Sequence, residues 1–235
     1  MMDDANNTIS TIITAERIVT VSKMLSLPDD ILHMLNEYED NIYGNLGATC
    51  KSLYRFRKKY IYLKMNGTCS LKYYKDAAFR DRVVSSVENP GKQISLNLSR
   101  TNSLEDVSKL GDVHTLDLSG CSSLVDVSML GNVHTLSLSL CNSLVDVSML
   151  GNVHTLDLTW CSSLVDVSKL GNVHTLNLSY CSSLVDVSML GNVHTLNLSH
   201  CSSLVDVSML GNVHTLDLSY CSSLVDVNKL GNVHT

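Results

Sequence analysis

The sequence is poor in features that mark several common classes of protein. Among its 235 residues it has 2 Pro, 2 Phe and 1 Trp, and charged residues make up 17%. No apolar run approaches the roughly 18–20 residues that span a bilayer, so we expect no contact with membranes. The chain begins Met-Met-Asp-Asp, without the basic stretch and apolar core of a secretory signal. We therefore expect a soluble, intracellular protein, cytoplasmic or nuclear.

Catalytic and cofactor-binding motifs are missing as well. The chain has no glycine-rich phosphate loop and no nucleophile elbow, and none of its 8 cysteines lies in a CxxC pair. Residues 93–235 carry 4 Lys or Arg against 12 Asp or Glu, whereas residues 1–92 carry 13 against 11. An acidic repeat region argues against a nucleic-acid partner, because phosphate binding needs a basic face. We expect no catalytic residues, no cofactor and no metal.

What the sequence has instead is a 20-residue unit that recurs in phase. Six full copies begin at Val113 and at every twentieth residue up to Val213, after a degenerate copy from Gln93 and before a truncated one from Val233. Positions within the unit are numbered from 1, which is Val113 in the first full copy. Such a strict period predicts a solenoid over residues 93–235, since one unit cannot bury its apolar side without neighbours.

The apolar positions of the unit predict a strand followed by tight turns. A step of two residues is typical of a strand, and steps of three fit turns or 3₁₀ segments, in which side chains at i and i+3 eclipse. In the first full copy these positions are Val113, Leu116, Leu118, Cys121, Leu124, Val127 and Leu130. The pattern, LxxLxLxxCxxL, resembles the leucine-rich repeat. The resemblance implies a parallel β-sheet on a concave face and short turns or 3₁₀ segments on a convex face.

Four further positions of the unit carry the same polar or small residue along the repeats, and we call each such series a column. The cysteines at position 9 read as small, buried and reduced side chains, although a spacing of about 4.8 Å between coils leaves a disulfide open. The aspartates at position 14 suit a side-chain cap on the free N–H groups of a short turn, with a metal ladder as the alternative. The glycines at position 19 suit a turn with positive φ.

The histidines at position 2 form the fourth column. We interpret them as a stacked, half-exposed structural row, with a metal site or a pH switch as alternatives. If they do stack, protonation near pH 6.5 would place like charges side by side and loosen the repeats.

Two positions vary between copies and predict the binding surface. Both are expected to face solvent on or beside the concave face, where large aromatic side chains resemble a protein-binding hot spot. Position 8 runs Arg100, Gly120, Leu140, Trp160, Tyr180, His200, Tyr220, and position 5 runs Asn97, Asp117, Ser137, Asp157, Asn177, Asn197, Asp217. The alternative is that the position-8 side chains only stack on one another and stabilise the sheet. From these rows we predict target contacts by Leu140, Trp160, Tyr180, His200 and Tyr220, and by Asp117, Asp157, Asn177, Asn197 and Asp217.

Ahead of the repeats, residues 1–24 show no period and are expected to be a loosely ordered lead-in. Residues 25–65 contain Leu27-Pro28-Asp29-Asp30-Ile31-Leu32 and Leu46-Gly47-Ala48-Thr49-Cys50-Lys51-Ser52-Leu53-Tyr54. These segments resemble the F-box, although the central Leu-Pro step of that family is absent. The resemblance implies a contact with the adaptor subunit of a cullin–RING ubiquitin ligase through Leu27, Pro28, Ile31, Leu32 and Cys50. The alternative is an ordinary helical cap on the first repeat.

The apolar spacing over residues 70–88 predicts one further helix. With its flanks it makes residues 66–92 a helical N-terminal cap, and Ile94 to Leu98 the first strand of the repeats. The fold class expected is therefore α+β, a small helical N-terminal domain followed by a leucine-rich-repeat solenoid. The combination is similar to F-box/leucine-rich-repeat proteins of large DNA viruses and unicellular eukaryotes.

We interpret the chain as a non-catalytic substrate receptor, with a leucine-rich interaction scaffold unconnected to ubiquitin, or a pseudo-receptor, as alternatives. Because the eighth unit stops at Thr235, we also expect fraying or self-association at the C-terminal repeat edge, or a sequence that is a truncated form of a longer chain.

Overall fold

The computed structural model describes residues 62–225 and Leu230, in two compact units, Met1–Ser95 and Leu96–Thr235. Most of the F-box-like range therefore lies outside the described residues, and so do its five predicted contact residues. Within the described part of the chain, no helix combines the length and apolarity needed to cross a membrane.

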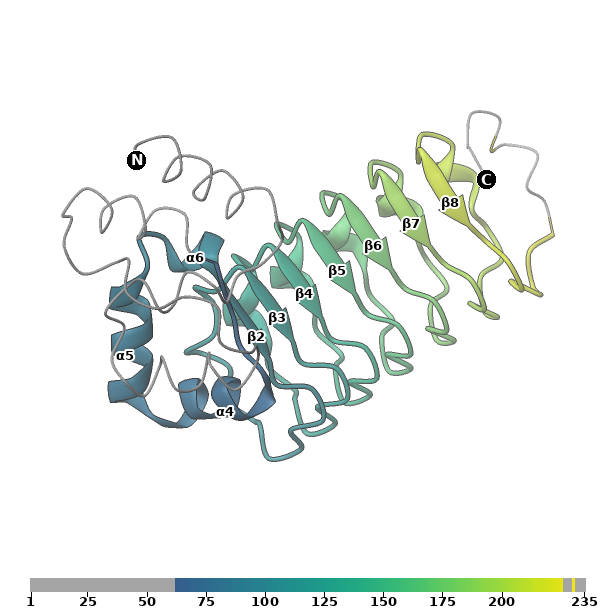
Figure 1. Cartoon of the computed structure of the whole chain (residues 1–235). Helices are drawn as coiled ribbons and strands as arrows, with labels where there is room; N and C mark the ends of the chain where they lie inside the picture. The colour runs from purple at the N-terminus through teal and green to yellow at the C-terminus, as the bar shows by residue number, and fades with distance from the viewer. Residues whose placement is uncertain (1–61, 226–229, 231–235) are drawn as a thin grey trace, which may run out of the picture. The chain divides into compact units, whose positions relative to one another are not determined.

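The described part of the first unit, residues 62–95, is mostly helical (Figure 1) and includes one short parallel strand pair. Its elements are β1 (Leu63–Lys64), α4 (Gly67–Lys75), α5 (Ala77–Ser86), α6 (Pro90–Gln93) and the start of β2 (Ile94–Asn97). β1 pairs with β2 through Leu63 opposite Ile94. The sequence predicts β2 but not β1, which lies at the end of the range expected to be helical.

The helix predicted over residues 70–88 is two helices, because Asp76 breaks it. Asp76 has extended backbone, and its carboxylate accepts a hydrogen bond of 3.0 Å from the backbone N–H of Phe79, which caps α5. Asn66 caps α4 in the same way through the N–H of Cys69, at 2.9 Å. Tyr73, Phe79 and Val83 are buried between these elements. The apolar pattern predicts the buried face but not the break, because an aspartate fits a helix surface as readily as a cap.

The second unit consists of coils that each contribute one three-residue strand. Five successive strand pairs are parallel, and each residue lies opposite its counterpart one repeat later, as in Thr135↔Thr155 and Leu136↔Leu156. The strands are β3 (Thr115–Asp117), β4 (Thr135–Ser137), β5 (Thr155–Asp157), β6 (Thr175–Asn177), β7 (Thr195–Asn197) and β8 (Thr215–Asp217).

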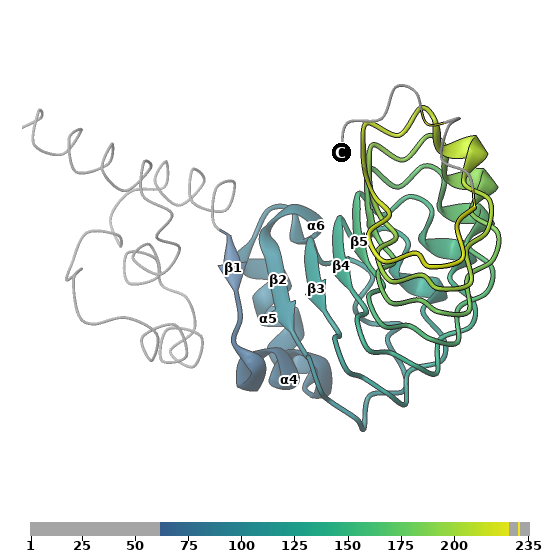
Figure 2. The same ribbon diagram turned by 90° about the vertical axis from the view of Figure 1, so that its right-hand side faces the viewer.

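Short 3₁₀ segments run along the other side of these coils (Figure 2). They are η2 (Ser128–Leu130), η3 (Ser148–Leu150), η4 (Ser168–Leu170), η5 (Ser188–Leu190) and η6 (Ser208–Leu210). Strand, turn and 3₁₀ segment thus occupy the positions that the spacing of apolar residues predicts. The fold is a leucine-rich-repeat solenoid.

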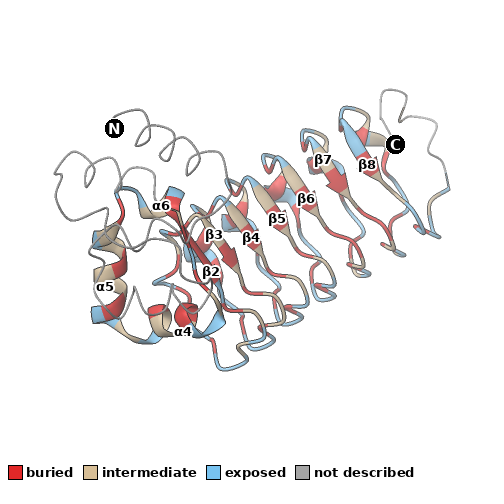
Figure 3. Cartoon of the chain, viewed as in Figure 1, coloured by how far each residue is buried: buried red, intermediate tan, exposed pale blue. Residues whose placement is uncertain are grey.

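The core of the second unit is formed by the seven predicted apolar positions of the coils, except in the last coil, where Leu218, Leu224 and Leu230 are only partly buried (Figure 3). In the first full copy Val113, Leu118, Cys121, Leu124 and Leu130 are 0% exposed, and Leu116 and Val127 are 1% and 2% exposed. Because identical positions stack in register, each leucine packs on the leucine of the next coil. A coil therefore buries its apolar side only between neighbours.

The prediction of positive φ at the position-19 glycines is wrong. Gly131, Gly151, Gly171 and Gly191 have φ near −60° and continue the 3₁₀ segment as right-handed residues. Their need for glycine comes from the next coil. A Cβ on Gly151 would lie far inside 3.0 Å of the Lys169 carbonyl oxygen, closer than real Cβ atoms come. Glycine at position 19 therefore allows two coils to approach.

Candidate functional site

The sheet face of the second unit presents rows of polar side chains. Along each strand the leucines at positions 4 and 6 point into the core, and the residues at positions 3, 5 and 7 point outward and are partly exposed in most coils. Their side chains are hydroxyls at positions 3 and 7, and carboxylates or amides at most copies of position 5. The sheet face can thus form many hydrogen bonds, and the two rows that flank it differ in chemistry.

Three residues after each strand ends, position 8 has the left-handed backbone conformation that glycine adopts most easily. The φ values are 62° at Leu140, 63° at Trp160, 62° at Tyr180, 61° at His200 and 61° at Tyr220. The backbone N–H of Trp160 donates to the Ser179 carbonyl at 3.0 Å, and that of Tyr180 donates to the Ser199 carbonyl at 2.9 Å. These bonds extend the coil-to-coil pairing beyond the strand and fix each position-8 backbone.

The position-8 side chains form a continuous stack, which we term the aromatic ladder: Trp160, Tyr180, His200 and Tyr220. Ring centroids are 4.1 Å apart from Trp160 to Tyr180, 4.2 Å from Tyr180 to His200 and 4.4 Å from His200 to Tyr220, with interplanar angles of 8–10°. Trp160 is 47% exposed and Tyr220 77%. Stacking and exposure therefore occur together, as both interpretations of position 8 require.

Leu140 precedes the ladder in the same row and is 46% exposed. The structure thus brings the five predicted position-8 residues into one line along the ends of β4 to β8. In that line the ring faces of the ladder pack on each other, and their edges form an apolar border to the polar sheet face.

The predicted position-5 residues have a local role that the sequence analysis missed. Each accepts a hydrogen bond from the backbone N–H two residues later, which fixes the turn leading to position 8. The distances are 2.9 Å for Asp117, 3.0 Å for Asp157 and Asn177, 2.8 Å for Asn197 and 2.9 Å for Asp217. The signal was present in the sequence as Asx followed two residues later by Ser or Thr. These side chains therefore support the ladder whether or not they also contact a target.

On the opposite flank of the strands, the histidines of position 2 form a second stack. Ring centroids of neighbours from His114 to His214 lie 4.5–4.6 Å apart. Each Nδ1 lies 3.0–3.2 Å from the hydroxyl of the following threonine, as in His154 and Thr155. Partial burial, with a smaller contribution from His134, lowers the pKa of His114. The stacked row expected from the sequence is confirmed.

The cysteine column is buried, and its thiols are free of disulfides. Each thiol donates to a carbonyl oxygen of the preceding coil, as from Cys161 to Leu138 at 3.2 Å. Burial raises the pKa of Cys141 to about 11 and that of Cys181 to about 12, so these thiols are protonated and unreactive at neutral pH. Among the described residues, no cluster of three His, Cys, Asp or Glu side chains could hold a metal ion.

The aspartates of position 14 cap the 3₁₀ turns, as the sequence predicts. The carboxylates of Asp126, Asp146, Asp166 and Asp186 each accept the backbone N–H two residues later at 2.9 Å. These hydrogen bonds hold the pKa of each carboxyl below its usual value. The column is therefore fully ionised at neutral pH.

Comparison with known proteins finds likeness in solved structures only. No family model matches the sequence, and no curated protein matches it. An internalin of Listeria monocytogenes, InlF, is 16% identical over 57% of this chain and 48% of its own, with a TM-score of 0.37. Internalin C2 of the same organism is 18% identical over 63% of this chain and 67% of its own, with a TM-score of 0.38.

The functional domain of InlJ from L. monocytogenes, which includes a cysteine ladder, is 21% identical over 64% of this chain and 39% of its own, with a TM-score of 0.40. This chain thus spans about half the length of InlF.

Proposed function

We propose that the protein is a non-catalytic receptor that binds a target protein along the sheet face, with the aromatic ladder as the main apolar contact. The observation that carries the proposal is a set of large side chains at a backbone position that favours glycine. A left-handed conformation costs a residue with a Cβ roughly 1–2 kcal/mol. Gly120 adopts it without that cost, yet the next five coils carry Leu, Trp, Tyr, His and Tyr.

Strain of this kind in a row of exposed aromatic side chains supports a binding role rather than a purely structural one. Stacking recovers part of the cost, since an aromatic pair contributes about 0.5–1.5 kcal/mol beyond its buried area. It also holds the rings rigid, so that a target binds a preorganised surface and loses little side-chain entropy. The polar rows beside the ladder would supply the hydrogen bonds of the rim.

The experiment is affinity capture with the intact chain, followed by calorimetric titration of the protein identified. Replacing Trp160 and Tyr180 by Ser removes the centre of the ladder, and we expect it to weaken binding by about 100-fold, the effect of losing a hot spot. The matched control is Asn152→Asp, at an exposed position that Asp112 occupies in an earlier copy, and it should leave the affinity unchanged. Equal affinity of the Trp160/Tyr180 variant and the native chain would contradict the proposal.

The finer proposal is that the receptor serves a cullin–RING ubiquitin ligase inside the cell. Its support is the F-box-like sequence of residues 25–65, with Leu27, Pro28, Ile31, Leu32 and Cys50 at the adaptor contact. Co-purification of the intact chain with recombinant adaptor subunit tests it, and Ile31→Glu should abolish the complex. If the native chain does not bind the adaptor, the alternative of an interaction scaffold with no ligase link stands. Self-association through the C-terminal repeat stays a prediction, because residues 226–229 and 231–235 lie outside the described part.

A further inference from the structure

The repeats carry a second exposed apolar surface, on the side of the 3₁₀ segments. Valine at position 13 in five coils and methionine at position 17 in four of them are 53–62% exposed. We name this set the outer stripe: Val125, Val145, Val165, Val185, Val205, Met129, Met149, Met189 and Met209. The proposed target surface does not use it.

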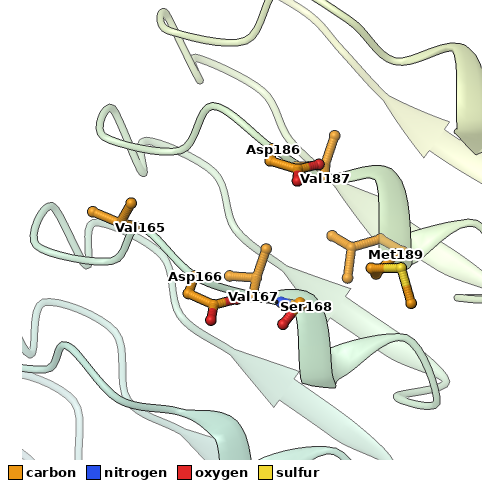
Figure 4. A pocket seen from close by; sticks show the side chains of 8 residues that line it. Val165, Asp166, Val167, Ser168, Asp186, Val187 and Met189 are labelled. Carbon is orange, nitrogen blue, oxygen red and sulfur yellow. Dashed lines mark hydrogen bonds between the residues drawn. The ribbon is translucent and has the colours of Figure 1, made fainter.

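The two columns of the outer stripe meet at a hollow between two coils. Figure 4 shows one hollow, of about 330 Å³, between the coils of η4 and η5. Val165 borders it from one coil and Met189 from the next, while the buried Val187 and Leu190 form part of its lining. At this hollow a valine and a methionine of the outer stripe therefore lie on the same side of neighbouring coils, together with Asp166, Ser168 and Asp186.

The fold itself does not need these apolar side chains. The degenerate first copy has Glu105 at position 13 and Lys109 at position 17, and Lys169 stands in the midst of the methionines. Neighbouring exposed positions of the same coils are mostly Ser and Asn. Because contiguous apolar patches beyond about 300–600 Å² are uncommon on monomers and mark interaction sites, the outer stripe calls for a partner.

The charge of this surface decides which partner fits. The exposed aspartates Asp126, Asp146, Asp166, Asp186 and Asp206 run between the valine and methionine columns. Lys169 is the only Lys or Arg between Val113 and Val225. Five carboxylates against one ammonium disfavour nucleic acid, an anionic membrane and the same face of a second copy. They favour a cationic segment.

We propose that the outer stripe binds a cationic amphipathic helix of a partner protein. Its apolar side chains would fill the hollows between the valine and methionine columns, and its Lys or Arg residues would pair with the aspartate column. The geometry supports a helix laid across the coils, since coils repeat about every 4.8 Å and a helix turns every 5.4 Å. Side chains one turn apart thus meet successive hollows over several coils.

The test is fluorescence anisotropy of two labelled synthetic 18-residue helices. Both carry leucine on one face, and the opposite face is lysine in one and glutamate in the other. We expect the lysine peptide to bind the intact chain, with an affinity that falls as salt rises, and the glutamate peptide not to bind. Met149→Lys combined with Met189→Lys should weaken the lysine peptide at least about tenfold, because it removes apolar contact and adds like charge. The native Lys109 and Lys169 show that these lysines are compatible with the fold.

Two further variants serve as controls. One tests the contribution of charge to peptide binding, and the other tests whether this binding is independent of the aromatic ladder. Asp146→Asn with Asp166→Asn and Asp186→Asn keeps an oxygen to cap each turn, and it should reduce the salt dependence of binding. Trp160→Leu, which copies Leu140, should not change the peptide affinity, so the two proposals fail independently. Unchanged binding in the double Met→Lys variant, or binding of both peptides alike, overturns the proposal. So does self-association, or adsorption to phosphatidylserine vesicles, that the same double variant abolishes.

Discussion

The left-handed backbone at position 8 puts the same conformational strain on a whole row of large side chains. At Leu140 the exposed side chain has none of the ring contacts that the aromatic ladder makes, so its cost in backbone strain is least offset there. β-branched residues are the least suited to positive φ, and glycine is the best suited.

We therefore expect Leu140→Gly to raise the free energy of unfolding by about 1 kcal/mol and Leu140→Val to lower it by about as much. Urea unfolding followed by circular dichroism measures both. Leu140→Asn is the control, since asparagine tolerates this conformation, and it should lie between the two. Equal midpoints for the glycine and valine variants would show that φ at this position is not strained.

At the same scale, the sequence predicts which residues are buried but not why each is needed. Cys121, Leu124 and Leu130 could be assigned to the core because a period of 20 with fixed apolar steps admits one burial pattern. The strain at Trp160 and the close approach at Gly151 could not be predicted from the sequence. Both depend on the coil that follows rather than on local propensity. The position-5 contacts were within reach, as Asx turns with the next Ser or Thr.

Individual coils are held together by close backbone approach at their 3₁₀ ends. Gly151 lies against the Lys169 carbonyl, and the same contact joins Gly131 to Met149 and Gly171 to Met189. Because the contact is with backbone, no rotamer change in a neighbour can make room for a Cβ. The spacing of coils on this side is therefore set by position 19.

Gly151→Ala should then separate two coils and destabilise the fold by about 3 kcal/mol, the upper part of the range for overpacking. A fall in the urea midpoint at constant m measures the loss. Val165→Ala, on the exposed part of the neighbouring coil, is the control and should change the midpoint little. A Gly151→Ala protein as stable as the control would mean that the coils shift at no cost.

Over the whole molecule, two titrating columns make stability depend on pH. The position-14 carboxyls have lowered pKa values, so the stability that they provide is present above their ordinary pKa near 3.8 and is lost as pH falls through the lowered values. His114, whose pKa is below its ordinary 6.5, acts at higher pH. As the pH falls, His114 binds its proton at a higher pH in the unfolded protein than in the folded one. Acidification through about pH 6.5 therefore favours unfolding.

The ring of His134, stacked 4.6 Å from that of His114, adds to this effect, because two imidazolium rings at that distance repel one another. We expect the melting temperature to fall between pH 7.5 and pH 5.5, and to fall again below pH 4. Replacing His114 by Gln removes the imidazole whose pKa is lowered, and it should flatten the first step while leaving the second. A melting temperature that does not change between pH 7.5 and 5.5 would exclude the effect.

The in-register pairing of every coil with its successor has a consequence for the length of the chain. Since Thr135 lies opposite Thr155 and Leu136 opposite Leu156, with the same partners one unit further on, any coil interface can replace any other. Removing residues 133–152 would join Asn132 to Val153 and leave each remaining interface with its usual partners. Only the order of the variable side chains would change, with Gly120 next to Trp160 and Leu140 absent. The gain or loss of whole units can thus change the order of the variable side chains without altering the scaffold.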